Sequence, residues 1–411
     1  MSLTDYVIMP GADYQAICDA IREKTETTEP IKSGDAAGMI QAFQGGGEVI
    51  KAMCENETYD LTGDNVEFVC DHAFNSEYRL KSVSLKNAKT VGRSAFDNCD
   101  NLETVSLPAV TSIGIFAFNN CDNLKTLEIP NVVTIEQQAF KACGLPNINA
   151  PNVNTVGYGA FRESKLETAS FPKARLFQDS AFYNCGSLKS VSMPLAMEAY
   201  PRIFQHCSNL EHTDILQAIS RVGAYWFSGC SKLVTLPCLY MNNVGMYAFE
   251  NCTSLQGFTY SETQGTSAPT GIGEGAFLGC EALTDEAVKI LTSWLSVIEP
   301  YVFYSCKSIT KVDLPMATEI KAAAFQFCSN LTAVILRHNA TLCVMDFSAF
   351  YETPLFNLQG YIYVPSAMYE PYRAVYSDAL DAAYAEIGVT IDGGIFNVMF
   401  RKIEDYPEIC G

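Results

Sequence analysis

A short pattern of hydrophobic and polar positions recurs along most of this chain at intervals of about 22 residues. One clear unit, LETVSLPAVTSIGIFAFNNC, runs from Leu102 to Cys121. Leu102, Val105 and Leu107 predict a short strand, because apolar residues alternate with polar ones at its end. Pro108 ends that strand, since proline has no N–H for the next ladder bond. Each unit therefore contributes one short strand and a turn.

The dipeptide Ala-Phe marks the turn of each unit. Its phenylalanine, in thirteen units, stands at positions 74, 96, 118, 140, 161, 182, 204, 227, 249, 277, 303, 325 and 350. In three units Ile203, Trp226 or Val302 replaces the alanine. A single unit of this size cannot bury its apolar face, whereas stacked units share a continuous core. We expect a leucine-rich-repeat solenoid of about 13 rungs, with one phenylalanine ring stacked in each rung.

Cysteine occupies the third position after the phenylalanine in ten units: Cys99, Cys121, Cys143, Cys185, Cys207, Cys230, Cys252, Cys280, Cys306 and Cys328. Side chains stacked in register have Cβ atoms about 4.8 Å apart, whereas a disulfide prefers about 3.8 Å. We therefore expect thiols that fill the core as small apolar groups. Cys54 and Cys70, outside this column, could pair near the first rung. The C-x2-C spacing of zinc sites is absent from the sequence.

The full repeat, L-x-x-V-x-L-P-x-V-x-x-I-G-x-x-A-F-x-x-C, resembles the BspA-like leucine-rich repeats of bacterial surface proteins. The resemblance covers about residues 60–365. It implies a solenoid that acts as an adhesin or binding protein at the cell surface. Because members of that family are regarded as lacking catalytic residues, the resemblance supplies no catalytic position to transfer.

The two ends differ from the repeats, so we predict a helical N-terminal segment with a glycine linker (1–47), a solenoid (48–365) and a C-terminal cap (366–411). Within the first segment, ADYQAICDAIREKT and PIKSGD resemble the start of phage-tail or prophage structural proteins of gut bacteria. The segment is either a helical cap for the first rung or an attachment module, and the two roles are compatible. In the C-terminal cap we expect a helix over 367–387 and a strand over 395–403.

Two units carry insertions. Residues 261–273, SETQGTSAPTGIG, are small and polar and predict a protruding loop, which is either a binding element or a neutral connection. Residues 284–297 predict a helix in place of a strand, with Thr284 as its N-cap. Val288, Leu291 and Trp294 share one face of that helix, so we expect Trp294 to pack into the core.

The outward face of the strands is the candidate ligand-binding surface. Val83 and Leu85 point inward, so their neighbours point outward. The outward residues in successive rungs are Ser82, Ser84, Thr104, Ser106, Thr126, Glu128, Asn147, Asn149, Thr168, Ser170, Ser190, Ser192, His212 and Asp214, with Lys311 and Asp313 further along. Such a band of hydroxyls and amides suits an extended glycan or protein strand held by many weak contacts. Alternatively, Ser and Thr are simply strand-compatible surface residues.

Composition narrows the function. The net charge of −19 over 411 residues disfavours binding to nucleic acid or to anionic membranes. No apolar run is long enough to span a bilayer, so we expect no membrane insertion, and residues 1–10 lack the features of a signal peptide. Only four histidines are present, and His206 and His212 beside Cys207 indicate no catalytic pair. We expect no enzyme activity, no metal and no cofactor.

Three hypotheses of function remain. The first is a non-catalytic adhesion protein that binds an unknown protein or glycan at a bacterial surface. The second is a phage or prophage tail-associated structural or receptor-binding protein, which the missing signal peptide favours. The third is an intracellular interaction scaffold. The first two predict a location at the cell surface or on an extracellular particle.

Overall fold

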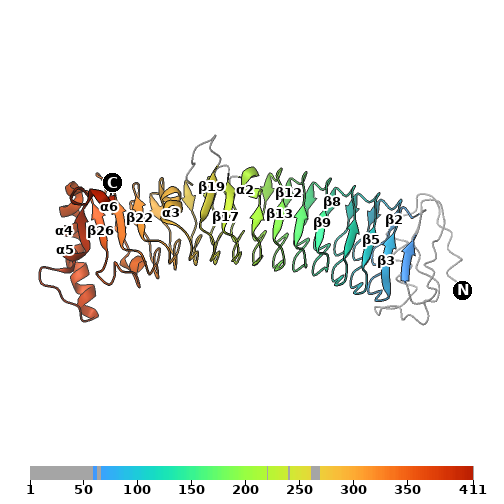
Figure 1. Ribbon diagram of the computed structural model, residues 1–411, viewed down its shortest axis with the longest axis horizontal. Coiled ribbons are helices and arrows are strands. Elements are labelled where there is room, and N and C mark those ends of the chain that lie inside the picture. Colours follow the sequence, from blue (N-terminus) through green and yellow to red (C-terminus); the bar gives the residue numbers. More distant parts are fainter. Residues whose placement is uncertain (1–58, 63–65, 220, 239–240, 261–268, 411) are drawn as a thin grey trace. The chain divides into compact units, whose positions relative to one another are not determined.

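The computed structural model describes residues 59–62, 66–219, 221–238, 241–260 and 269–410 (Figure 1). Its contacts divide the chain into two compact units, one up to Ala218 and the other from Ile219 onward. We call them unit 1 and unit 2. The predicted N-terminal helical segment and most of the predicted 261–273 loop lie outside the described residues. The division into 1–47, 48–365 and 366–411 stays a prediction.

Unit 1 is a stack of coils, each with one longer and one shorter strand, and all pairings are parallel. The longer strands are β1 (Tyr59–Thr62), β3 (Leu80–Ser84), β5 (Thr104–Ser106), β7 (Thr126–Glu128), β9 (Asn147–Asn149), β11 (Thr168–Ser170), β13 (Ser190–Ser192) and β15 (His212–Thr213). They form two four-stranded sheets, β1-β3-β5-β7 and β9-β11-β13-β15 (Figure 1).

The shorter strands form one seven-stranded sheet. Its members are β2 (Phe68–Val69), β4 (Thr90–Val91), β6 (Ser112–Ile113), β8 (Thr134–Ile135), β10 (Thr155–Val156), β12 (Leu176–Phe177) and β14 (Glu198–Ala199). A short helix, α2 (Ile215–Ala218), ends the unit. Pairing is in register, so Thr104 lies between Ser82 and Thr126, and Val105 lies between Val83 and Leu127. The repeat spacing of the sequence therefore becomes columns of equivalent residues.

The core of each coil lies between its two strands and the Ala-Phe turn. Val105 and Ile113 point inward from the two strands and are buried. The phenylalanine rings stack nearly parallel, with centroids 5.1 Å apart between Phe96 and Phe118 and 5.3 Å between Phe118 and Phe140. Because Ala precedes Phe, the backbones of neighbouring turns approach closely enough for this stack. The predicted ring column is confirmed.

The Ala-Phe turn contains two residues in the left-handed region. In the Phe118 coil these are Phe116, with φ 57°, and Asn120, with φ 55°, two residues before and two after the phenylalanine. Alternate N–H groups of the turn donate to the next coil, as when Phe96 N–H donates to Ala117 O at 2.8 Å. Asn and Gly recur at the second of these positions because they tolerate positive φ at low cost.

The column cysteines are buried thiols, as the stacking distance predicts. Each thiol with a described contact donates to the phenylalanine carbonyl of the preceding coil. Cys121 Sγ lies 3.2 Å from Phe96 O, and Cys207 Sγ lies 3.0 Å from Phe182 O. Cysteine is thus both a small core filler and a weak donor. Cys54 is outside the described residues, so its pairing with Cys70 stays untested.

Unit 2 repeats this architecture in four sheets. The shorter strands are β16 (Arg221–Val222), β18 (Asn243–Val244) and β20 (Gly271–Ile272) in one sheet, and β21 (Val297–Ile298), β23 (Glu319–Ile320) and β25 (Val344–Met345) in another. The longer strands are β17 (Thr235–Cys238) and β19 (Gly257–Tyr260), followed separately by β22 (Lys311–Leu314), β24 (Ala333–Leu336), β26 (Tyr361–Val364) and β27 (Phe400–Lys402). A 3-10 helix, η2 (Phe347–Phe350), forms the last Ala-Phe turn.

A helix replaces one strand, as predicted: α3 (Asp285–Thr292) lies beside β22. Thr284 Oγ1 caps it by accepting from Ala287 N–H at 3.2 Å. Val288 and Leu291 are buried, but the prediction that Trp294 is core is wrong, because that side chain is 67% exposed. The helix ends at Thr292, so Trp294 no longer follows the helical spacing that placed it beside Leu291.

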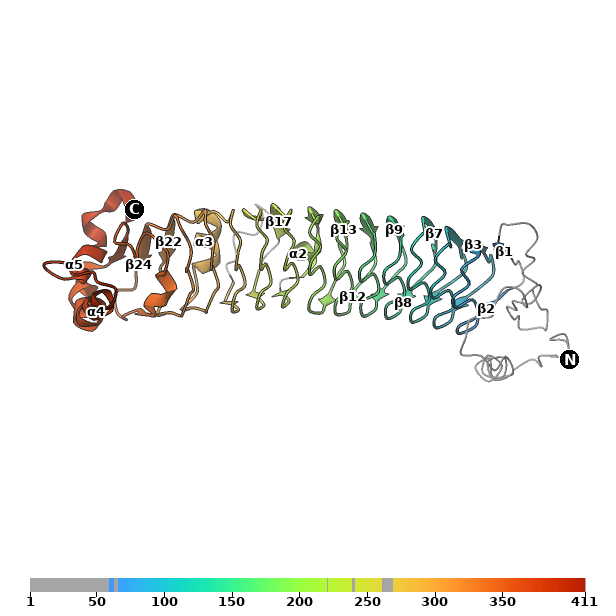
Figure 2. The ribbon, with the colours of Figure 1, turned by 90° about the horizontal axis from the view of Figure 1, so that it is seen from below.

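The C-terminal end of unit 2 is helical. The predicted helix is α4 (Ser366–Glu386), with α5 (Ile395–Met399) packed beside it (Figure 2). The predicted strand over 395–403 is wrong for its first half, since only β27 is extended. Tyr372 Oη accepts from Cys343 N–H at 2.8 Å, and Tyr376 Oη accepts from Met345 N–H at 2.9 Å. These phenols pair the N–H groups at the edge strand β25.

Candidate ligand-binding surface

The strand face of unit 1 is the outward surface of its longer strands, made of the fourteen residues predicted from Ser82 to Asp214. None of these side chains is buried. The exposed ones are Thr104, Thr126, Glu128, Asn147, Asn149, Thr168, Ser192 and His212, and the half-buried ones are Ser82, Ser84, Ser106, Ser170, Ser190 and Asp214. Their inward neighbours Val83, Val105 and Val191 are buried. The structure therefore brings the predicted residues onto the outward faces of two β-sheets, each built of parallel strands.

Hydrogen bonds between neighbouring coils hold several side chains of the strand face in place. Hydroxyl groups donate to the adjacent coil from Ser82 to Asp60 (2.5 Å), from Ser106 to Glu128 (2.7 Å), from Thr168 to Asn147 (2.6 Å) and from Ser192 to Asp214 (2.8 Å). Asp214 also accepts from Met193 N–H at 2.6 Å. The acceptors are thus oriented before any ligand arrives, which lowers the ordering cost of binding.

Ion pairs lie directly before the N-terminal ends of these strands. Lys125 Nζ lies 2.8 Å from Glu103, and Lys189 Nζ lies 2.6 Å from Glu167. The hydrogen bond from Lys125 lowers the pKa of Glu103. These pairs are exposed, so each contributes little to folding stability. Their effect is on the surface: positive and negative side chains alternate along the edge of the strand face where the strands begin.

Two kinds of side chain in the described residues bear on metal binding and nucleophilic chemistry: the metal-ligating types His, Cys, Asp and Glu, and the column thiols. In that part of the chain, no three His, Cys, Asp or Glu side chains lie close enough together to hold a metal ion. His212 is exposed at the end of the strand face, and the column thiol Cys121 is buried, where burial raises its pKa. A raised pKa disfavours the thiolate that acts as a nucleophile. Within the described ranges, no helix is both long and apolar enough for a bilayer crossing.

In unit 2 the corresponding strand surface is partly covered by the chain itself. Lys311 and Asp313 point outward from β22, as predicted, while Val312 and Leu314 are buried. On the next strands the outward residues Ala333, Ile335 and Tyr363 are also buried, against a segment made of η3 (Ile403–Asp405) and α6 (Pro407–Cys410). We call residues 403–410 the C-terminal segment.

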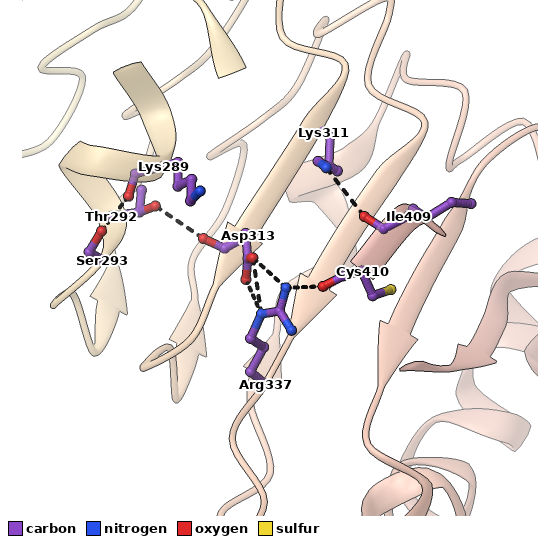
Figure 3. Close-up of polar contacts among 8 residues, drawn as sticks. All are labelled: Lys289, Thr292, Ser293, Lys311, Asp313, Arg337, Ile409 and Cys410. Atoms are coloured by element: carbon purple, nitrogen blue, oxygen red, sulfur yellow. Dashed lines mark hydrogen bonds and ion pairs between the residues drawn. The ribbon is translucent and has the colours of Figure 1, made fainter. Parts of the chain in front are cut away.

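Polar contacts fix this segment on the strands (Figure 3). Arg337 forms a two-pronged ion pair with Asp313, with N–O distances of 2.7 and 2.8 Å, and also donates to Cys410 O. Lys311 Nζ donates to Ile409 O at 3.2 Å. Both cations thus donate to carbonyl groups at the C-terminal end of α6. These carbonyls have no hydrogen-bond partner within the helix.

The sequence did not predict this docking, although it contains a signal. Strand β24 reads Ala-Val-Ile-Leu, with no polar residue in the outward positions, and all four side chains are buried. An unbroken apolar strand indicates that both faces are covered. Helix α3 also contacts Asp313, the partner of Arg337, because Thr292 Oγ1 donates to Asp313 O at 3.3 Å.

Three solved bacterial structures are similar to this chain. A bacterial leucine-rich repeat protein from Bacteroides ovatus is 22% identical, with a TM-score of 0.54 over 75% of this chain and 85% of that one. A leucine-rich cell surface protein from Faecalibacterium prausnitzii is 20% identical, with a TM-score of 0.36 over 70% and 81% of the two chains. A leucine-rich repeat protein from Eubacterium ventriosum is 15% identical, with a TM-score of 0.38 over 69% and 85%.

No curated protein matches the sequence. The family described as "BspA type Leucine rich repeat region (6 copies)" matches residues 52–167, 111–234, 154–267 and 242–370. These overlapping matches span most of the chain and agree with the repeat and with the stacked parallel strands. The chain therefore belongs to the BspA-type leucine-rich repeat family.

Proposed function

We propose that this protein is a non-catalytic binding protein that presents the strand face of unit 1 to a macromolecular ligand at a bacterial surface. One observation carries the proposal: fourteen outward side chains lie in register on two parallel sheets, and none is buried. Regular rows of hydroxyls, amides and carboxylates offer many equivalent hydrogen-bonding sites. An extended ligand gains from such rows by making many weak contacts.

The ligand is a protein or a glycan, and the C-terminal segment favours a protein. On β22, β24 and β26 of unit 2, the same kind of surface already holds a polypeptide, through apolar contacts with Ala333, Ile335 and Tyr363 and through charged contacts with Arg337. The strand surface of this repeat is thus geometrically suited to a short helical polypeptide segment. Polar side chains in unit 1 replace the apolar ones, which suits a reversible complex.

Family membership supports the location at a bacterial surface, which is part of this proposal. In this scheme residues 1–47 attach the chain, residues 48–365 display the ligand-binding coils and residues 366–411 cap them. Recovery of the chain from sedimentable phage-like particles in a fractionated culture, rather than from the protease-accessible cell surface, would favour the phage alternative.

Two arginine substitutions test the strand face. Thr126→Arg and Thr168→Arg place large charged side chains at exposed positions, so we expect the fold to be retained. Asn154→Arg is the matched control, because Asn154 is exposed in the same unit immediately before a strand of the opposite sheet. Purified protein is applied to arrays of extracellular matrix proteins and glycans, and the affinity for each bound probe is then measured by calorimetry.

We expect the two strand-face variants to bind at least about tenfold more weakly than the original chain, a loss of about 1.4 kcal/mol. The Asn154→Arg control should bind as the original chain does. If all three variants bind with the affinity of the original chain, the strand face is excluded as the binding surface.

A further inference from the structure

Exposed aromatic rings gather on the Ala-Phe turns of unit 2, away from the strand surface. Tyr301, Tyr304, Phe327 and Tyr351 belong to the turns of three successive coils, and we call them the aromatic edge. Three of them are substantially exposed: Tyr301 at 39%, Phe327 at 39% and Tyr351 at 43%. Ring centroids lie 6.0 Å apart between Tyr301 and Tyr304, and 5.2 Å apart between Tyr304 and Phe327. Phe327 N–H donates to Tyr351 O at 2.9 Å, so the next coil is adjacent.

Folding stability does not explain the residue type at Phe327. Tyr301, with φ 59°, and Phe327, with φ 62°, occupy the two left-handed positions of their turns. A bulky side chain is disfavoured there, whereas Asn and Gly are tolerated. Other coils have Asn98, Asn120 and Asn251 at the position of Phe327. Aromatic residues recur at the position of Tyr301, as in Phe116, Tyr225 and Tyr247, so the exception is Phe327. Backbone strain combined with exposure of its apolar ring indicates that Phe327 has a role outside the fold.

The base beneath these rings is rigid. The buried rings of Phe303, Phe325 and Phe350 stack beneath the turns, with centroids 5.4 and 6.1 Å apart. Ser305 N–H donates to Gln326 O at 2.8 Å, which joins neighbouring turns. The backbone that carries the aromatic edge is therefore fixed before a ligand binds, which lowers the ordering cost of binding.

We propose that the aromatic edge binds a neutral glycan chain, as a site separate from the strand face. Sugar rings present flat C–H faces that pack on aromatic rings and hydroxyls that form hydrogen bonds. Tyr304 and Phe327 come from successive coils, and their ring centroids lie 5.2 Å apart in an edge-to-face pair, so a sugar can pack its C–H face on one ring and contact the edge of the other. Among the described residues, none is hydrogen-bonded to the phenol hydroxyls of Tyr301, Tyr304 or Tyr351.

The surroundings favour a neutral sugar over other occupants. Ser305, Gln326 and Glu352 flank the rings and can bond to sugar hydroxyls. The nearby Lys321 is already paired with Glu299 at 2.8 Å, and the net charge of the chain is −19, which disfavours anionic glycans. A proline-rich peptide requires an aromatic-lined groove. Here the planes of Tyr304 and Phe327 meet at 69°, an edge-to-face pair rather than two parallel groove walls.

The test uses the full chain and saturation-transfer NMR with neutral hexasaccharides of β-1,4-linked glucose, mannose and xylose. A sulfated hexasaccharide and a decaproline peptide serve as the competing probes. The variant Phe327→Asn with Tyr304→Gln introduces residues that the repeat itself has at these positions, as in Asn251 and Gln326. Phe116→Asn is the matched control, because Phe116 is also an aromatic residue in the left-handed region, on a turn of unit 1.

We expect saturation transfer to at least one neutral hexasaccharide, and at least a tenfold weaker affinity in the double variant. The Phe116→Asn control should bind that sugar as the original chain does, and the double variant should melt at the same temperature or higher. The proposal is overturned if no neutral sugar binds, if the double variant binds as well as the control, or if only the sulfated sugar or decaproline binds. Binding by the strand face is measured with its own variants, so each of the two proposals can be contradicted without the other.

Discussion

At the scale of single residues, the cysteine column shows how one position serves two physical needs. The position must be small and apolar to fit between stacked coils, and Cys143 and Cys328 are fully buried there. It also faces the phenylalanine carbonyl of the preceding coil, 3.0 Å away for Cys328 and Phe303. Alanine would fit but could not donate, whereas a thiol fits and donates weakly. The sequence predicted the thiols, but the hydrogen bonds required the coil geometry.

The buried thiols predict a loss of stability at alkaline pH. Burial raises the pKa of Cys143 and of Cys328 from the ordinary 9.0 to about 12. An acid whose pKa is raised by folding holds its proton more tightly in the folded state. Its contribution is therefore complete below pH 9 and is lost as the pH rises towards 12.

We expect the free energy of unfolding to fall from pH 9 upward, by about 1.4 kcal/mol per pH unit for each such thiol. Guanidinium denaturation at pH 8, 9, 10 and 11 measures this slope. The variant Cys143→Ala should show a slope smaller by the contribution of one thiol, whatever its stability at pH 8. An unchanged slope in this variant would contradict the assignment.

At the scale of the element, the Ala-Phe turn is the feature that repeats most strictly. Its second left-handed residue, two positions after the phenylalanine, is Asn, Ser or Gly in many coils, but is Ala142 in the Phe140 coil, with φ 49°. The backbone is set there by hydrogen bonds to the next coil, such as Ala142 N–H to Arg162 O at 2.8 Å. The stack thus imposes the left-handed conformation even on a residue that disfavours it.

Ala142→Gly should therefore stabilise the protein. Glycine adopts positive φ without steric cost, and after the larger entropy of its unfolded state is subtracted we expect a gain of about 0.5–1 kcal/mol. Ala139→Gly, three residues earlier, is the control, because Ala139 is buried and lacks positive φ. That control should destabilise by about 1 kcal/mol or more. Chemical denaturation compares the two, and a loss of stability in Ala142→Gly would show that its Cβ contributes packing that outweighs the strain.

At the scale of the whole molecule, the periodicity of the sequence predicted the features that recur from coil to coil. It did not predict the features that occur in only one place. The ring column, the thiols, the outward positions of the strand face and the helix after Thr284 follow from spacing alone. Trp294 was misplaced because the end of α3 is set by packing rather than by propensity. The aromatic edge was missed because its rings lie at turn positions that vary between coils. The docking of residues 403–410 joins Arg337 to a carbonyl 73 positions away, which no local pattern encodes.

That long-range contact leads to the last prediction, which concerns how the C-terminal segment is held on the strands of unit 2. Arg337 is half-buried, pairs with Asp313 and donates to Cys410 O, so its removal breaks charged hydrogen bonds to both. Arg337→Met keeps the aliphatic stem and removes the charge. To avoid leaving Asp313 unpaired, the variant is combined with Asp313→Asn. Arg373→Met is the control, because Arg373 lies 3.9 Å from Glu370 in an exposed pair on α4, which should contribute little.

Hydrogen exchange then reports the docking directly. Ile409 and Cys410 N–H both donate to the carbonyl of Tyr406, the residue before α6, so their protection depends on the segment staying folded on the strands. Charged hydrogen bonds contribute about 1.5–3 kcal/mol each. We therefore expect exchange at these two amides to rise at least about tenfold in the double variant, while amides in α4 keep their protection. If exchange at Ile409 and Cys410 matches that in the Arg373→Met control, the apolar contacts with Ala333, Ile335 and Tyr363 are sufficient to hold the segment and the charged contacts only orient it.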